Sequence, residues 1–240
     1  MEALYDVGTR RYLEAVGVAE GWRCAEVGAG AGSITQWLSD RVGTSGAVLA
    51  IDLDIRFVEP LAERGNVEVR IQDITAEPLE ESAYDLVHAR AVLEHIPSRD
   101  EVVPRLVAAL RPGGALVLED VVIRHPPFHP PSALWDRVGE AFTRAFELTG
   151  ADALYGLRLP AAMEAAGVQD VESEARSRVA FSGTPSVDFM ALSLEQLGDR
   201  FVAAGLLTAD EVAQARDEIR TPGRVVLAPM MVAAWGRRPA

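Results

Sequence analysis

Short apolar runs and amphipathic segments alternate along the first half of the chain. Apolar runs bounded by turn residues predict buried strands, whereas apolar residues three or four positions apart predict helices. The predicted strands cover 23–27, 47–51, 67–71, 84–89 and 115–118. The predicted helices cover 3–17, 33–42, 55–64 and 99–110. This alternation predicts an α/β fold, in which a doubly wound parallel sheet is covered on both faces.

The second half of the chain is less regular. The proline-rich run at 125–131 cannot be a helix interior or a central strand, so it is expected as a linker. Ser132 and Thr208 are expected as N-caps of two of the later helices. The later predicted helices cover 132–149, 158–166, 186–204 and 209–220, and the later strands cover 168–181 and 225–235.

Two parts of this second half bear on function. The segment 126–157 is rich in aromatic residues and is expected to be a helical lid over a pocket, although an ordinary packed helix would show the same pattern. The helical pair at about 186–220 is expected to pack into the core, with a homodimer face as the less favoured alternative. We therefore expect one domain over 1–240 with these two additions.

Composition and charge narrow the class of protein. Apolar residues make up 49% and charged residues 25% of the 240 positions, which is typical of a globular domain. The net charge of −13 argues against binding nucleic acid. The one cysteine, Cys24, is expected to be a reduced core thiol. With no signal peptide and no run of about 18 apolar residues, a soluble cytoplasmic protein without a membrane partner is expected.

A glycine-rich turn, E-V-G-A-G-A-G at 26–32, follows the first predicted strand. In open α/β sheets this position lies at a topological switch point, where ligands bind. A nicotinamide site favours G-x-G-x-x-G, but here Ser33 stands where the last glycine would be. The carboxylate of Glu26 would repel a pyrophosphate, whereas it suits the cationic methionine end of S-adenosyl-L-methionine (SAM). The turn therefore favours SAM over a dinucleotide.

Carboxylates follow the next two predicted strands. Asp52 ends the second strand, where a carboxylate can accept hydrogen bonds from both ribose hydroxyls. Asp54 is expected to cap the following helix. Asp73 follows the third strand and can accept from an adenine amino group while Ile74 packs on the ring, although a plain loop aspartate fits as well. Both features indicate an adenosine-containing ligand.

The ordered motifs E-V-G-A-G-A-G, I-D-L-D, Q-D-I, Y-D-L-V-H-A-R-A-V-L-E-H-I-P and L-R-P-G-G-A-L-V-L-E-D cover about 22–120. Together they resemble the class I SAM-dependent methyltransferases, and less closely those of bacterial secondary metabolism such as antibiotic biosynthesis. The resemblance implies a seven-stranded sheet whose antiparallel last strand, here 225–235, is inserted beside the fifth. It also implies SAM as cofactor, S-adenosyl-L-homocysteine (SAH) as product, and no metal.

The resemblance also assigns roles to particular residues. Glu26 and the turn would hold the methionine portion, Asp52 the ribose, and Asp73 with Ile74 the adenine. The backbone around Arg90 would meet the methionine amine. The full set of cofactor-binding residues expected is Glu26, Gly28, Ala29, Gly30, Gly32, Ser33, Asp52, Leu53, Asp73, Ile74 and Arg90.

The acceptor side is expected around His95, just after the fourth strand. A histidine there could take a proton from an acceptor near neutral pH, although packing at a helix start explains it equally. His88 is expected in the core, and His125 or His129 is the next candidate for reaching the acceptor. Glu119 and Asp120, at the end of the fifth strand, are expected either to bind the acceptor or to be solvated.

We therefore expect methyl transfer to oxygen or nitrogen of a small-molecule acceptor, with a secondary metabolite as the favoured class. A SAM-fold enzyme with another reaction, such as a cyclisation, is an alternative because the cofactor motifs would be the same. A non-catalytic SAM-binding protein and a nicotinamide oxidoreductase are less favoured. Glu26 and Ser33 weigh against the last of these.

Overall fold

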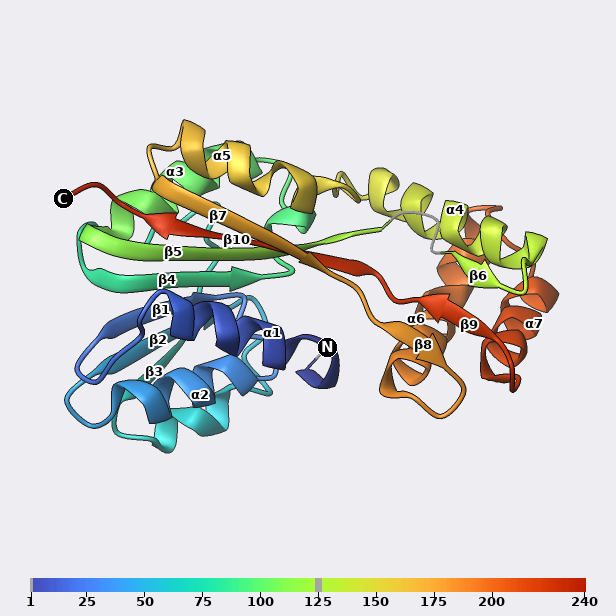
Figure 1. Ribbon diagram of the computed structural model, residues 1–240, viewed down its shortest axis with the longest axis horizontal. Coiled ribbons are helices and arrows are strands. Elements are labelled where there is room, and N and C mark those ends of the chain that lie inside the picture. Colours follow the sequence, from blue (N-terminus) through green and yellow to red (C-terminus); the bar gives the residue numbers. More distant parts are fainter. Residues whose placement is uncertain (1, 124–126) are drawn as a thin grey trace.

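A seven-stranded sheet forms the centre of the computed structural model, which describes residues 2–123 and 127–240 (Figure 1). The strand order is β3-β2-β1-β4-β5-β10-β7. The first five strands pair in parallel, and β10 pairs antiparallel with both β5 and β7. This confirms the doubly wound, mostly parallel sheet with an antiparallel last strand. The strands are β1 Arg23–Val27, β2 Ala47–Asp52, β3 Val67–Ile71, β4 Tyr84–Arg90, β5 Leu110–Val122, β7 Gln169–Arg176 and β10 Met230–Arg237.

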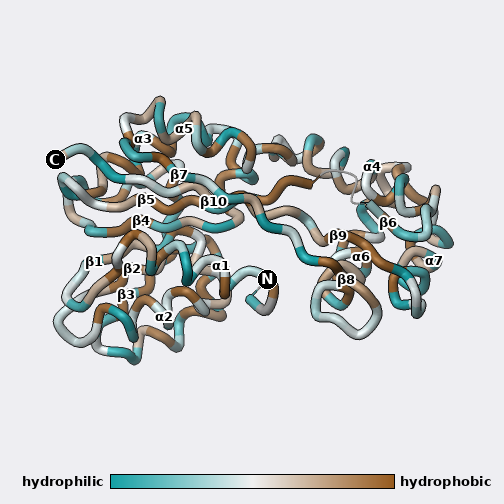
Figure 2. Tube along the Cα trace, viewed as in Figure 1, coloured by the Kyte–Doolittle hydropathy of each residue, from teal (hydrophilic) through white to brown (hydrophobic). Residues whose placement is uncertain are grey.

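Helices cover both faces of this sheet, because most residues of its inner strands are apolar and buried, whereas the edge strand β7 is mostly hydrophilic (Figure 2). One face packs on α1 and α2 and the other on α3 and α5 (Figure 1). The sheet and these helices are called the sheet unit below. Its helices are α1 Glu2–Ala15, α2 Ser33–Val42, α3 Arg99–Ala109 and α5 Leu159–Ala165, with short 3-10 helices η1 Glu59–Glu63, η2 Leu93–His95 and η3 Tyr155–Arg158.

A second group of elements, the helical unit, lies at the right of Figure 1 beyond the carboxyl end of β5. It has its own core, in which Trp135, Leu194 and Phe201 are buried, so core packing explains the apolar residues at 186–220. Thr208 forms a capping box and Ser132 accepts from the backbone of Trp135, as N-caps do. The unit comprises α4 Ala133–Leu148, α6 Pro185–Ala203, α7 Ala209–Arg220 and a sheet of β6 Phe128–His129, β9 Val225–Leu227 and β8 Val179–Phe181.

Three sequence predictions need correction. The predicted strands 168–181 and 225–235 are each divided, as β7 with β8 and as β9 with β10. Pro229 lies between β9 and β10 and has no N–H group to donate to a neighbouring strand. Ser177 lies between β7 and β8, and its hydroxyl donates to the carbonyl of Ala228 at 2.7 Å. The predicted helix 55–64 is only η1. Asp54 does not cap it, because its carboxylate accepts from the backbone and guanidinium of Arg56 in a local turn.

The fifth strand is also longer than predicted. It runs from Leu110 to Val122, so Glu119 and Asp120 lie inside it and are buried. The alternative that these two carboxylates are solvated is therefore wrong. Among the helices of the described residues, none is both long and apolar enough to cross a membrane.

Candidate functional site

The glycine turn between β1 and α2 is held by the backbone of β2. The N–H groups of Gly28 and Ala29 donate to the carbonyl of Ile51 at 2.8 and 3.1 Å. Gly28 has a φ of +71°, and a Cβ atom added there would lie 2.2 Å from Cγ2 of Val92. Only glycine allows both the conformation and this close approach. The turn is therefore packed directly against the segment that follows β4.

The carboxylates predicted for the ribose and the adenine lie at the same edge of the sheet. Asp52 ends β2 and accepts the N–H of Gly30 at 2.8 Å, so the turn and this carboxylate are fixed relative to each other. Leu53, next to it, is 70% exposed. Asp73 accepts from the backbone and hydroxyl of Thr75, which lowers the pKa of its carboxyl, and Ile74 is buried. This edge thus offers an ordered hydrogen-bond acceptor, the carboxylate of Asp52, and the apolar side chains of Leu53 and Ile74.

Glu26 lies beneath the turn and is only 4% exposed. Its carboxylate accepts from the hydroxyl of Thr35, and its Oε1 lies 3.7 Å from Nδ1 of His88. The other ring nitrogen of His88 lies 3.3 Å from Oε1 of Glu119, so one buried imidazole lies between two carboxylates. Burial lowers the pKa of His88, but the two carboxylates together outweigh it and the pKa is raised. His88 is a core residue, as expected, and it links β1 to β5.

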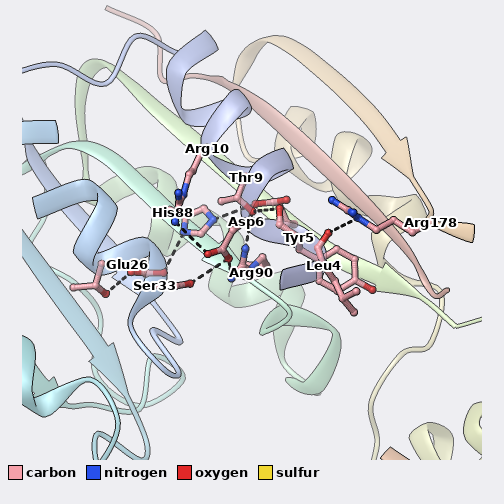
Figure 3. A network of polar contacts seen from close by, with 12 residues as sticks. Leu4, Tyr5, Asp6, Thr9, Arg10, Glu26, Ser33, His88, Arg90 and Arg178 are labelled. Carbon is pink, nitrogen blue, oxygen red and sulfur yellow. Dashed lines mark hydrogen bonds and ion pairs between the residues drawn. The ribbon is translucent and has the colours of Figure 1, made fainter. Parts of the chain in front are cut away.

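The amino-terminal helix α1 is fastened across this edge by a polar network (Figure 3). Asp6 accepts from the hydroxyl of Ser33 at 3.1 Å and from the guanidinium of Arg90 at 3.0 Å. A second nitrogen of Arg90 donates to Thr9 at 2.8 Å. The side chain of Arg90 is thus engaged by α1. Sequence reasoning missed Asp6 and Thr9, because they lie among other polar residues of α1 and no local pattern distinguishes them.

The segment after β4 carries a pair of buried carboxyl groups. Asp120 accepts the N–H of Val92 at 3.1 Å, and Glu94 accepts the N–H of Val121 at 2.6 Å. Burial, and then the negative charge of Glu94, raise the pKa of Asp120 well above its ordinary value. The remaining oxygen of Glu94 lies 3.3 Å from Nε2 of His95. The segment is therefore held on β5, and His95 is oriented by Glu94.

A cavity of about 1070 Å³ lies between this segment and the helical unit. The sheet unit contributes Tyr5, Ala91, Glu94 and His95, and the helical unit contributes mainly apolar side chains of α4 and α6. His95 is 54% exposed, and its ring lies 5.3 Å from that of Phe146 on α4. Burial, and then Glu94, raise the pKa of the Tyr5 phenol to about 12, so it stays protonated and donates to a carbonyl.

The histidines thus separate by position. His95 shares the cavity with α4, as expected from its place after the fourth strand. His129 lies exposed on β6 and is not among the residues that line the cavity. His125 lies outside the described residues. The same segment contacts the glycine turn through Val92 and the cavity through Ala91, Glu94 and His95. The edge of the sheet that carries the glycine turn, Asp52 and Asp73 is called the cofactor edge below, because the sequence predicts that it binds SAM. This edge and the cavity therefore meet at residues 91–95.

The sequence is also similar to known proteins. Residues 25–118 match the family described as a methyltransferase domain. The chain is 29% identical over 167 residues to trans-aconitate 2-methyltransferase of Variovorax paradoxus. The match covers 70% of this chain and 62% of that protein. It is 30% identical over 123 residues to methyltransferase GfsG of Streptomyces halstedii. That match covers 48% of this chain and 44% of GfsG. The chain thus spans less than two thirds of the length of either relative.

Among solved structures, the fold is similar to phosphoethanolamine N-methyltransferase 2 of Haemonchus contortus, determined with phosphomonomethylethanolamine and S-adenosylhomocysteine. The TM-score is 0.63, the identity is 17%, and the match covers 98% of this chain and 53% of that one. At this identity the likeness concerns the fold alone.

Proposed function

We propose that this protein transfers a methyl group from SAM to oxygen or nitrogen of a small molecule, as a class I methyltransferase, because residues 25–118 match the family described as a methyltransferase domain. The acceptor class that we propose is a secondary metabolite. The observation that carries the proposal is the place where the two halves of the site meet. Residues 91–95 contact the glycine turn on one side and line the large cavity on the other.

The residues at the cofactor edge fit the parts of SAM. Asp52 would hold the ribose hydroxyls, Leu53 and Ile74 would pack on the adenine, and Asp73 would accept from its amino group. Glu26 supports the turn from below with a negative charge that favours the cationic methionine end. The remaining contacts would come from the backbone of the turn and of β4, through Gly28, Ala29, Gly30, Gly32, Ser33 and Arg90.

The cavity residues fit the acceptor side of a displacement at carbon. SAM supplies an electrophilic methyl group, so the protein has to orient the acceptor, exclude water and, for a hydroxyl, remove a proton. Nε2 of His95 lies 3.3 Å from Oε1 of Glu94, so Nδ1 would be the nitrogen that takes that proton. We propose that α4 is the lid that excludes water, because its aromatic face lines the cavity. Tyr155, at the end of the segment 126–157, packs instead in the core of the sheet unit.

Calorimetry tests the cofactor assignment. We expect SAM and SAH to bind and NAD not to bind. Asp52→Ala should weaken SAH binding by about 1–3 kcal/mol, the scale for losing hydrogen bonds to a charged group. Asp54→Ala is the matched control, because Asp54 is exposed two residues away and bonded to Arg56. Equal affinity of the Asp52 variant and the wild type would remove Asp52 from the ribose role.

The reaction itself is tested by incubating the enzyme with SAM and libraries of acceptors, and detecting SAH and methylated products by mass spectrometry. Methyl transfer predicts one SAH for each product. A product formed without SAH would favour the alternative of a SAM-fold enzyme with another reaction, such as a cyclisation. SAM binding without any product from a broad library would favour a non-catalytic SAM-binding protein.

A further inference from the structure

The cavity has a size and a shape that restrict its occupant. Its volume of about 1070 Å³ is at the upper end of ordinary ligand pockets, so a molecule of a few non-hydrogen atoms would leave most of it empty. Phe189, Ser193, Leu197 and Arg200 line it from α6 and are spaced three or four apart, so one face of that helix forms the wall. The opposite wall is the apolar face of α4.

The two ends of this wall differ. Phe189, near the start of α6, packs beside Tyr5 and Val121 of the sheet unit. Arg200 lies eleven residues further along α6, about 16 Å away along the helix axis. The carboxyl end of α6 packs inside the helical unit, where Phe201 contacts Phe142. Arg200 therefore lies about 16 Å along α6 from the end of that helix that packs on the sheet unit.

Arg200 is also unusual among the arginines of this acidic chain. Most of them pair with a carboxylate or with backbone carbonyls, as Arg137 does with Glu211 and Arg216 with Glu195. Within residues 2–123 and 127–240, no carboxylate lies within ion-pair distance of Arg200. Among the described residues that line the cavity, His95 and Arg200 are the two side chains that can carry a positive charge. A guanidinium without a partner is suited to binding a carboxylate or a phosphate.

We propose that the acceptor is an elongated, mainly apolar molecule with an anionic group at the end opposite its methylated atom. This inference rests on the proposed function, because it places the reacting end at His95. The apolar body would lie between α4 and α6, and the anion would pair with Arg200. This combination of length, apolar walls and a remote cation disfavours both small polar acceptors and cationic amphiphiles.

Binding of three probes with one alkyl chain tests the inference in the presence of saturating SAH. The probes are dodecanoate, dodecan-1-ol and dodecylammonium, each kept below the concentration at which it forms micelles. We expect dodecanoate to bind about five- to tenfold more tightly than the alcohol, as for a partly exposed ion pair, and dodecylammonium to bind most weakly. Arg200→Gln should abolish the preference for the anion, and Arg200→Glu should reverse it. Arg220→Gln, an exposed arginine on α7 outside the cavity, should leave it unchanged.

Equal affinity for dodecanoate and dodecan-1-ol in the wild type would overturn the inference, as would a preference that survives in Arg200→Gln. A failure of all three probes to bind would overturn it as well. SAH affinity, measured in the same samples, separates these results from a failure of the proposed function. Normal SAH binding leaves that function standing with another kind of acceptor, whereas absent SAH binding contradicts it directly.

Discussion

The sheet unit and the helical unit build their binding surfaces in different ways. At the cofactor edge the surface is mainly backbone, with Gly28 at a φ of +71° and Asp52 bonded to the N–H of Gly30. In the helical unit the surface is a wall of side chains from α4 and α6, with few polar groups. A backbone surface depends on special conformations, whereas a side-chain wall depends on volume and shape.

This difference indicates which half of the site can change. Substitutions in the turn would disturb the backbone that we propose holds the cofactor, whereas apolar substitutions of similar volume in α4 or α6 would reshape the cavity at low cost in stability. Residues 91–95 belong to both halves, because Val92 packs on Gly28 while His95 lines the cavity. Acceptor specificity can therefore vary while cofactor binding is kept.

The largest expected effect lies where the two units meet. His95→Ala should lower turnover about 10²–10⁴-fold if His95 removes a proton, because that is the usual contribution of general base catalysis. SAH affinity should change less than twofold, since the cofactor contacts come from other loops. Turnover and calorimetric titration with SAH measure the two quantities. His129→Ala is the control, because His129 is exposed and outside the cavity.

A loss below tenfold for His95→Ala would limit His95 to positioning the acceptor. Such a result would fit transfer to a nitrogen that is already nucleophilic and needs little help from a base. A parallel loss of SAH affinity would contradict the separation of the two units, because it would show that the segment 91–95 controls both.

The second prediction concerns the stability of the helical unit. Phe201 is 1% exposed, and its ring lies 5.0 Å from that of Phe142. Phe201→Ala should cost about 3–5 kcal/mol, the usual range for truncating a buried aromatic residue. Hydrogen exchange should accelerate in α4 and α6 while SAH affinity stays unchanged. Leu192→Ala, on the exposed side of α6, should alter stability by about 0.5 kcal/mol or less.

Exchange that accelerates equally in β1 and β4 would contradict this second prediction. It would show that the two units unfold as one cooperative structure, and that the cavity cannot be remodelled without affecting the cofactor edge.

The same difference explains how much of the fold could be predicted from sequence. The strands 23–27 and 67–71 and the helix 33–42 have the predicted bounds, because each is an apolar run or amphipathic segment between turn residues. The broken strands at 168–181 and 225–235 were predicted as continuous, because sequence periodicity does not show where a ribbon leaves one sheet for another. The short helix η1 was predicted too long, because Asp54 forms a turn with Arg56.

The site could be predicted where it depends on motifs and missed where it depends on tertiary contacts. The turn and Asp52 lie together as the motifs indicated, and His95 lines the cavity with α4. The imidazole of His88 between two carboxylates brings together strands far apart in sequence, and no local pattern indicates it. The same holds for Arg200, which meets the cavity only because α6 and α4, far apart in sequence, both line it.

The smallest expected effect concerns the buried carboxyl of Asp120, where the two units join. Its pKa is raised in the folded protein by burial and by Glu94, so the folded state binds this proton more tightly than the unfolded state does. Stability from this group is fully present below the unfolded pKa of about 3.9 and is lost as the pH rises toward the folded pKa.

Asp120→Asn removes the charge but keeps an oxygen that can accept from Val92. The variant should therefore be more stable than the wild type at pH 8, by on the order of 1 kcal/mol, with the difference vanishing near pH 4. Urea unfolding at several pH values measures this, with the exposed Asp217→Asn as control. Equal pH dependence in variant and wild type would contradict the raised pKa of Asp120, because it would show that the fold does not change the affinity of this carboxyl for its proton.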